Sequence, residues 1–220
     1  MLSQLLALRG ELAGILGMTL FVSGVAIVIS MLLGVPLGIG LALGRFPGRR
    51  LLITLVNTGM GLPPVVVGLF VFLLLARSGP LGHLDLLYTP TAMILAQIII
   101  ALPLVVGVTL AGIQGLDPRL HLQILSLGAS RLQLCLKLVA EARLSLAAAL
   151  AAGFGSILSE VGAVMMVGGN LLGETRVMTT SIVLATRQGQ FTLAIALSVI
   201  LLLLAVGINA LFTRLQQGKR

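Results

Sequence analysis

Long apolar stretches separated by short polar ones dominate the chain. Five of them approach or exceed the roughly 20 residues that cross the hydrocarbon core of a bilayer as a helix. They cover about residues 18–44, 51–76, 91–115, 144–168 and 193–213. Residues 1–17 are apolar too, but they carry Arg9 and Glu11, and their leucines fall near one helical face. That pattern predicts a helix lying in the membrane interface. The chain is therefore predicted to be an all-α, polytopic membrane protein with about five transmembrane helices and one domain over residues 1–220.

Composition supports this class and excludes others. Hydrophobic residues make up 58% of the chain and charged residues 9%, which leaves too few polar side chains for a soluble or a disordered protein. The single cysteine, Cys135, and two distant histidines give no disulfide framework and no metal-ligand pair, so we expect no metal and no cofactor. Neither lysine, Lys137 or Lys219, is followed by Ser or Thr. The chain therefore has no phosphate-binding loop for ATP and is not expected to be an enzyme.

The net charge of +8 would suggest nucleic acid as a partner of a soluble protein. In a membrane protein such a charge more often marks cytoplasmic loops, and no nucleic acid is expected. Five spans place the termini on opposite sides. Ten basic residues fall on the side of loops 45–50 and 116–143 and the C-terminus, and four fall on the other side. This distribution predicts an outer N-terminus and a cytoplasmic C-terminus.

The loop over residues 116–143 is the long cytoplasmic connection. Its leucines alternate with charged residues around Gly128, which predicts two short amphipathic helices that meet at the glycine. Apolar residues exposed in the cytoplasm need a partner that covers them. The alternative is a loop that lies on the membrane.

The second span contains Asn57 and the pair Pro63-Pro64 near its middle. Two consecutive prolines remove two helical N–H donors and disturb the preceding carbonyls, which predicts a break in the helix. Such breaks face protein or a water-filled cavity, and in transporters they mark substrate routes. The alternative is a simple structural kink.

The fourth span carries a face of small and hydroxylated residues that includes Ser156, Ser159 and Glu160. A carboxyl group at this depth costs at least about 2.5–3.5 kcal/mol on insertion scales, so Glu160 needs a partner or water. It is a functional candidate for gating. The alternative is a carboxyl group capped by backbone or hydroxyl groups for packing.

The outer segment that follows is rich in hydroxyl groups and carries one arginine. Its candidate residues are Asn170, Thr175, Arg176, Thr179 and Thr180. Hydroxyls, backbone N–H groups and an arginine suit a tetrahedral oxyanion, so these donors are expected at the mouth of a path. The alternative is a surface that only touches a partner protein.

Four of these motifs together resemble a known family. Leu127-Gly128-Ala129-Ser130 resembles the coupling motif of ABC importer permeases. The Pro63–Gly68 break and the run from Ser159 to Asn170 resemble the molybdate/tungstate branch, and the run from Gly173 to Thr180 is most similar to tungstate-specific permeases. One departure is that Leu122-Gln123-Ile124 stands where the coupling motif usually opens with Glu-Ala-Ala. Glu141 stands in the place of its late proline.

The resemblance implies the permease subunit of an ATP-driven tungstate importer in a bacterial or archaeal cytoplasmic membrane. It implies a homodimer that docks two cytoplasmic ATPase subunits and receives the oxyanion from a periplasmic or extracellular binding protein. The coupling residues would be Leu127, Gly128, Ala129, Ser130 and Glu141. The translocation path would include Asn57, Pro63, Pro64, Ser156, Ser159, Glu160, Asn170, Thr175, Arg176, Thr179 and Thr180. Molybdate or sulfate import is the alternative within the family. A proton-coupled secondary transporter using Glu160 is a weaker one, because the sequence has no internal repeat.

Overall fold

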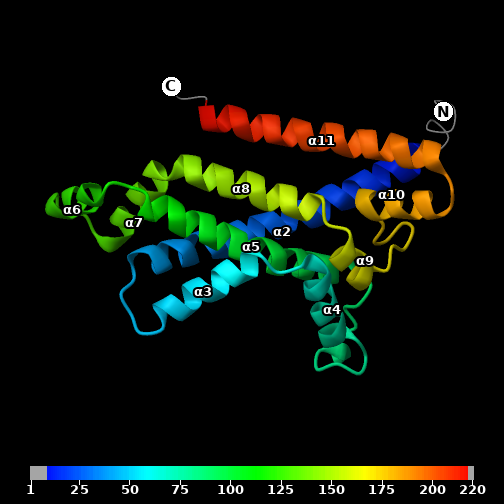
Figure 1. The fold of residues 1–220 in the computed structure, drawn as a ribbon, viewed down its shortest axis with the longest axis horizontal. Coiled ribbons are helices and arrows are strands. Elements are labelled where there is room, and N and C mark those ends of the chain that lie inside the picture. Colours follow the sequence, from blue (N-terminus) through cyan, green and yellow to red (C-terminus); the bar gives the residue numbers. More distant parts are fainter. Residues whose placement is uncertain (1–8, 218–220) are drawn as a thin grey trace.

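The computed structural model describes residues 9–217. Helices and short connections account for this part of the chain, and no strand occurs in it, which confirms the all-α class. The long helices lie side by side along the molecule's longest axis (Figure 1). They are α2 (Arg9–Leu43), α5 (Pro90–Gln114), α8 (Arg143–Leu158) and α11 (Phe191–Gln217).

Three of the five predicted spans are single helices, and two are bent pairs. Helices α2, α5 and α11 are each long and apolar enough to cross a membrane. The second span consists of α3 (Arg49–Met60) and α4 (Pro64–Leu75), which meet at 104°, so the break predicted at the two prolines is confirmed. In Figure 1, α4 points away from the other helices.

The fourth span is also bent. Helix α8 ends at Leu158, and the short α9 (Gly162–Gly168) continues at 59° to it, so the continuous helix expected over residues 144–168 is wrong. No proline marks this break. The hydroxyl of Ser159 instead donates to the carbonyls of Gly155 and Ser156, at 2.9 and 3.0 Å. Bonding of this kind competes with the helix and bends it.

Helix α2 begins earlier than predicted. Residues 9–17 continue the first span without interruption, which corrects the boundary expected at residue 17. Its 35 residues span about 52 Å at about 1.5 Å per residue, well beyond a hydrocarbon core of about 30 Å. The rest of the predicted interfacial helix, residues 1–8, lies outside the described residues.

Helix α5 occupies the centre of the bundle. It contacts α2, α3, α4, α8 and α9, and its Ala92, Ala96 and Ala101 are fully buried. Alanines allow helices to approach closely where lipid gives no hydrophobic force between them. Most of α11 is exposed, which suits a helix at the lipid boundary.

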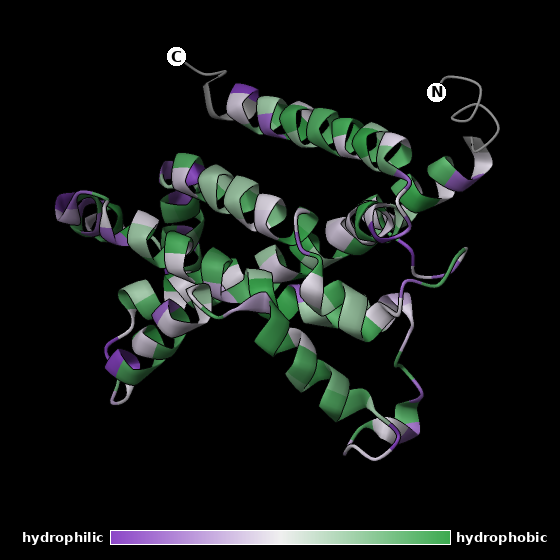
Figure 2. Cartoon of the chain, turned by 45° about the vertical axis from the view of Figure 1, so that its right-hand side comes forward, coloured by the Kyte–Doolittle hydropathy of each residue, from purple (hydrophilic) through white to green (hydrophobic). Residues whose placement is uncertain are grey.

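The two ends of the bundle differ from its middle. Helices α6 (Pro118–Ser126) and α7 (Arg131–Glu141) lie at one end with the last turns of α11. Helix α10 (Met178–Arg187), α9 and the first turns of α2 lie at the other (Figure 1). The short helix η1 (Gly82–Leu84) follows α4. Figure 2 shows hydrophobic residues along the middle of the helices and hydrophilic residues gathered near their ends. The arrangement suits a membrane-spanning bundle in which the start of α2 and the end of α11 lie on opposite sides (Figure 1).

Candidate functional site

The second halves of the two broken spans pack directly on each other. A Cβ atom on Gly68 of α4 would lie only 2.5 Å from the Cα of Ala163 in α9. One on Gly162 would lie 2.6 Å from the Cγ2 atom of Val65. Only glycine allows the two backbones to come this close, so α4 and α9 form one closely packed unit.

A cavity of about 260 Å³ lies at the first break. Its walls include Pro63, Pro64 and Ser156, so the structure brings together three residues predicted for the path. Residues 59–62, which are the end of α3 and the two residues that follow it, form another wall. Asn57 is exposed on α3 and does not line this cavity. The break therefore faces a cavity, as a break in a membrane helix requires.

Local hydrogen bonds satisfy the second break. The carboxylate Oε1 of Glu160 accepts the N–H of Ala163 at 2.8 Å, so it caps the first turn of α9. The Thr179 hydroxyl, from α10, donates to the Glu160 carbonyl at 3.0 Å. The Glu160 side chain is half-buried. These bonds match the capped-carboxyl alternative, and they also link α10 to the break.

One buried residue at this site was missed by the sequence reasoning. Gln97, in the first third of α5, is only 3% exposed, and its Nε2 donates to the Ile157 carbonyl at 3.2 Å. That carbonyl belongs to the last turn of α8, where the break removes its regular partner. The signal was available, because Gln97 is an amide within the long apolar run 91–113.

The threonines of the outer segment are less available than predicted. Thr175 is 1% exposed, and its hydroxyl donates to the Gly168 carbonyl and accepts the Leu171 N–H. Thr180 is fully buried and bonds both the N–H and the carbonyl of Val177, at the start of α10. Both hydroxyls hold the shape of the segment, so the expectation that they offer free donors at a mouth is corrected.

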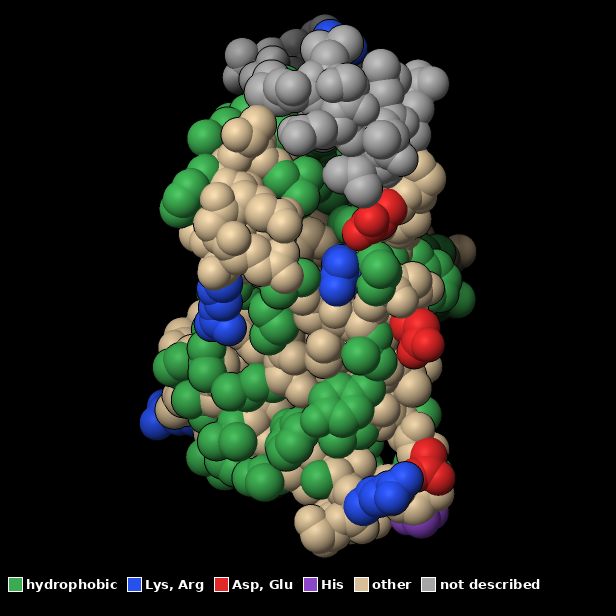
Figure 3. Space-filling model, turned by 90° about the vertical axis from the view of Figure 1, so that its right-hand side faces the viewer, with side chains coloured by type: hydrophobic (Ala, Val, Ile, Leu, Met, Phe, Trp, Pro, Cys, Tyr) green, Lys and Arg blue, Asp and Glu red, His purple; other side chains and the backbone are tan. Residues whose placement is uncertain are grey.

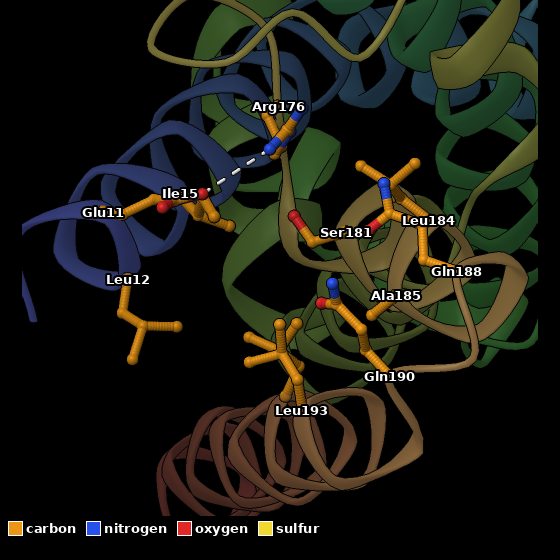
Figure 4. A pocket seen from close by; sticks show the side chains of 11 residues that line it. Glu11, Leu12, Ile15, Arg176, Ser181, Leu184, Ala185, Gln188, Gln190 and Leu193 are labelled. Carbon is orange, nitrogen blue, oxygen red and sulfur yellow. Dashed lines mark hydrogen bonds and ion pairs between the residues drawn. The ribbon is translucent and has the colours of Figure 1, made fainter. Parts of the chain in front are cut away.

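Arg176 lies elsewhere, in a second cavity of about 420 Å³ between α2, α10 and α11 (Figure 4). Its Nη1 pairs with the carboxylate of Glu11 at 3.5 Å, the one ion pair within the described residues, and Nη2 donates to the Asn170 carbonyl at 3.4 Å. This cavity shares no lining residue with the cavity at the prolines. The structure thus divides the predicted path residues between separate places.

The segment predicted to couple to an ATPase has the expected shape. Helices α6 and α7 flank Gly128, whose φ of 78° is in the left-handed region that favours glycine. Asp117 caps α6, and Ser130 forms a capping box with Gln133 at the start of α7. Leu127 is 87% exposed, and Ala129 and Glu141 lie in the turn and at the end of α7. The two predicted helices are confirmed. Leu134 and Leu138 of α7 are buried, but a row of other leucines is left exposed within residues 9–217: Leu122, Leu125, Leu127, Leu132 and Leu136.

Comparisons with known proteins agree with this architecture. The family described as "binding-protein-dependent transport system inner membrane component" matches residues 34–220. A probable anion ABC transporter permease protein of Haloferax volcanii is 42% identical, covering 92% of this chain and 90% of the relative. The tungstate uptake system permease protein TupB of Peptoclostridium acidaminophilum is 39% identical, with coverages of 92% and 89%.

Two solved structures share the fold. The MetNI methionine ABC transporter, in an inward-facing conformation, aligns with a TM-score of 0.74 at 17% identity, over 94% of this chain and 95% of the other. An amino acid ABC transporter crystallised with histidines aligns with a TM-score of 0.71 at 20% identity, with coverages of 98% and 97%.

Proposed function

The chain belongs to the binding-protein-dependent transport system inner membrane component family, and from this premise we propose that it is the permease subunit of an ATP-driven importer of tungstate. The observation that carries the choice of anion is the identity of about two residues in five with permeases named for anion and tungstate uptake, over nearly the whole of both chains. Sulfate permeases are matched at lower identity, 30% for the CysT protein of Escherichia coli.

Uptake measurements test the anion. In cells that lack the native gene, expression of this chain with its ATPase and binding protein should restore accumulation of tungsten but not of sulfur or molybdenum, as measured by elemental analysis. Restored molybdate or sulfate uptake alone would contradict the choice. Uptake that stops with a proton ionophore while ATP is maintained would favour the proton-coupled alternative.

The uncovered segment around Gly128 supports docking of an ATPase. Exposed leucines on two capped helices form the kind of apolar face that enters a groove on a partner. Gly128→Glu should reduce co-purification with the ATPase, because it adds a charge at the turn and strains a left-handed residue. The matched control is Gly189→Glu, since Gly189 also has a positive φ and open space around it but lies after α10. Equal complex formation by both variants would remove the docking assignment.

The cavity at the prolines supports a translocation path that forms between two copies of this chain in a homodimer. Helix α4 borders this cavity and exposes apolar side chains away from the bundle, including Phe70 at 62%. After Cys135→Ser, a cysteine in place of Phe70 should cross-link two chains in the membrane. A cysteine in place of Leu203, 65% exposed on α11, should not. Cross-linking through Leu203 alone would place the dimer interface elsewhere.

Glu160 supports gating through hydrogen bonds rather than through charge. A carboxylate on the route of an anion repels it, whereas its bond to α9 holds the break. Glu160→Gln keeps an acceptor and should retain partial uptake, and Glu160→Leu should lose it. Wild-type uptake by both variants would make the residue a tolerated packing group.

A further inference from the structure

A large cavity lies at the end of the bundle where α2 ends and α6 begins. Its volume is about 960 Å³. Two segments distant in sequence form it: residues 42–50, which include the turn before α3, and one side of α6, beginning at Pro118. None of the residues predicted for the translocation path lines this cavity.

The walls of this cavity carry basic side chains. Arg45, Arg49, Arg50 and His121 line it, and among the described residues no Asp or Glu does. Arg49 is held in place because its Nε donates to the Leu41 carbonyl at 2.7 Å. The side chains of Arg45 and Arg50 are exposed and make no hydrogen bond or ion pair within the described residues. Guanidinium groups gathered in a concave site without a carboxylate attract an anion and suit the oxygens of a phosphate.

The opposite end of the molecule has no comparable feature on the face that Figure 3 shows. Basic and acidic side chains there are few and scattered among hydrophobic and neutral ones. The basic cavity is therefore a local feature, and not a property of every loop of a positively charged chain.

The position of the cavity favours a lipid. It begins at the last residues of α2, where the long apolar span stops, and α3 exposes Leu51 and Leu52 directly after the arginines. Phe46 and Leu122 add apolar surface at the cavity itself. Arginines at the junction of an apolar span and a polar turn lie at the depth of lipid headgroups. Basic pockets of this kind between membrane helices bind anionic headgroups.

We propose that this cavity binds the phosphate headgroup of an anionic phospholipid, with its acyl chains along the apolar residues beside it. The lipid bridges the end of α2 and α6, one of the two helices of the proposed docking segment. It therefore fixes α6 relative to the membrane-spanning bundle, and the lipid composition of the bilayer becomes a determinant of coupling to the ATPase.

Binding of defined lipids to the full chain in detergent tests this proposal. Native mass spectrometry should show retention of dioleoyl phosphatidylglycerol but not of dioleoyl phosphatidylcholine, which has the same acyl chains and no net charge. The double variant Arg45→Gln/Arg50→Gln should weaken phosphatidylglycerol binding by roughly 30-fold, since one arginine near an anionic surface contributes about a factor of five. Arg49 is left intact because it bonds to the backbone of α2.

The matched control is Arg119→Gln/Arg131→Gln. It removes the same charge from exposed positions of the 116–143 loop, at the same end of the bundle, that do not line the cavity, and it should bind phosphatidylglycerol like the wild type. An equal loss in the control, or equal retention of the two lipids by the wild type, overturns the proposal. Displacement of the lipid by millimolar inorganic phosphate or tungstate would show that the cavity takes a soluble oxyanion instead. Loss of phosphatidylglycerol binding when the ATPase is added would show that the ATPase covers the cavity, and it would overturn the proposed role of the lipid in coupling.

Discussion

The close approach of α4 to α9 makes a sharp prediction about Gly68. Alanine at this position would place its Cβ 2.5 Å from the Cα of Ala163 and 3.0 Å from its Cβ. The nearer atom is backbone, so no rotation of a side chain relieves the contact, and α4 or α9 must move. Overpacking of this kind costs about 1–3 kcal/mol. Gly68→Ala should therefore lower the free energy of unfolding by that amount and reduce anion uptake, because α4 and α9 flank the two breaks.

Circular dichroism during denaturation in detergent measures the change, since the chain has no tryptophan for fluorescence. Gly155→Ala is the control: Gly155 lies inside α8 with no atom near its absent Cβ, so alanine should leave stability unchanged or raise it by up to about 1 kcal/mol. Adding Ala163→Gly to Gly68→Ala should restore only part of the loss, because the contact with the Cα remains. Wild-type stability and uptake of Gly68→Ala, or complete rescue by the second change, would refute the reasoning.

Three further outcomes concern polar contacts. Gln97→Leu should lower the free energy of unfolding by only about 1 kcal/mol, because its amide bonds the end of α8 but its Oε1 is buried without a partner in the described part of the chain; a loss above about 3 kcal/mol would contradict this. Thr175→Val should lower the free energy of unfolding by about 1–3 kcal/mol, because it leaves a buried carbonyl and a buried N–H unpaired. The control Thr186→Val, at an exposed hydroxyl, should lower it little. Equal losses in the two variants would show that the Thr175 hydrogen bonds have no specific role in stability. A double-mutant cycle of Glu11→Gln and Arg176→Gln should give a coupling energy below about 1 kcal/mol, because the two charged atoms are 3.5 Å apart and the Glu11 side chain is 37% exposed. A larger coupling energy would show that this ion pair is important for holding α2 to the segment before α10.

The sequence was sufficient where a feature depends on local chemistry. The two prolines act on the carbonyls just before them, so the break in the second span could be predicted and the structure confirms it. The turn at Gly128 depends only on residues adjacent to it in the sequence, and Ser130 caps α7 through Gln133, three positions further on, so both features could be predicted. The apolar spans depend on length and hydropathy alone.

The sequence was insufficient where a feature depends on partners distant in the chain. At the break after Leu158, Gln97 of α5 and Thr179 of α10 donate hydrogen bonds to backbone carbonyls, and no local sequence pattern predicts these contacts. The outer segment was predicted to offer free hydrogen-bond donors, because sequence alone does not show that the Thr175 hydroxyl is hydrogen-bonded to the backbone of its own loop. Residue types also do not show which side chains line the same cavity. Arg176 and Ser156 were both predicted for one path, but they line separate cavities in the structure.

The arrangement of α7, α8 and α9 suggests how an ATPase could act on the path. Ala142 is the single residue between α7 and α8 and caps both helices, so the docking segment continues into α8 without a flexible linker. Helix α8 then runs 16 residues, about 24 Å, to the break beside Glu160, and α9 beyond it packs on α4. Because the break is the one interruption between the start of α8 and the end of α9, we expect a movement that α7 passes to α8 to change the 59° bend rather than to compress α8. Spin labels on α8 and α9 should then change separation when the complete transporter binds ATP, while two labels within α8 should not; an unchanged α8–α9 separation would exclude this route of coupling.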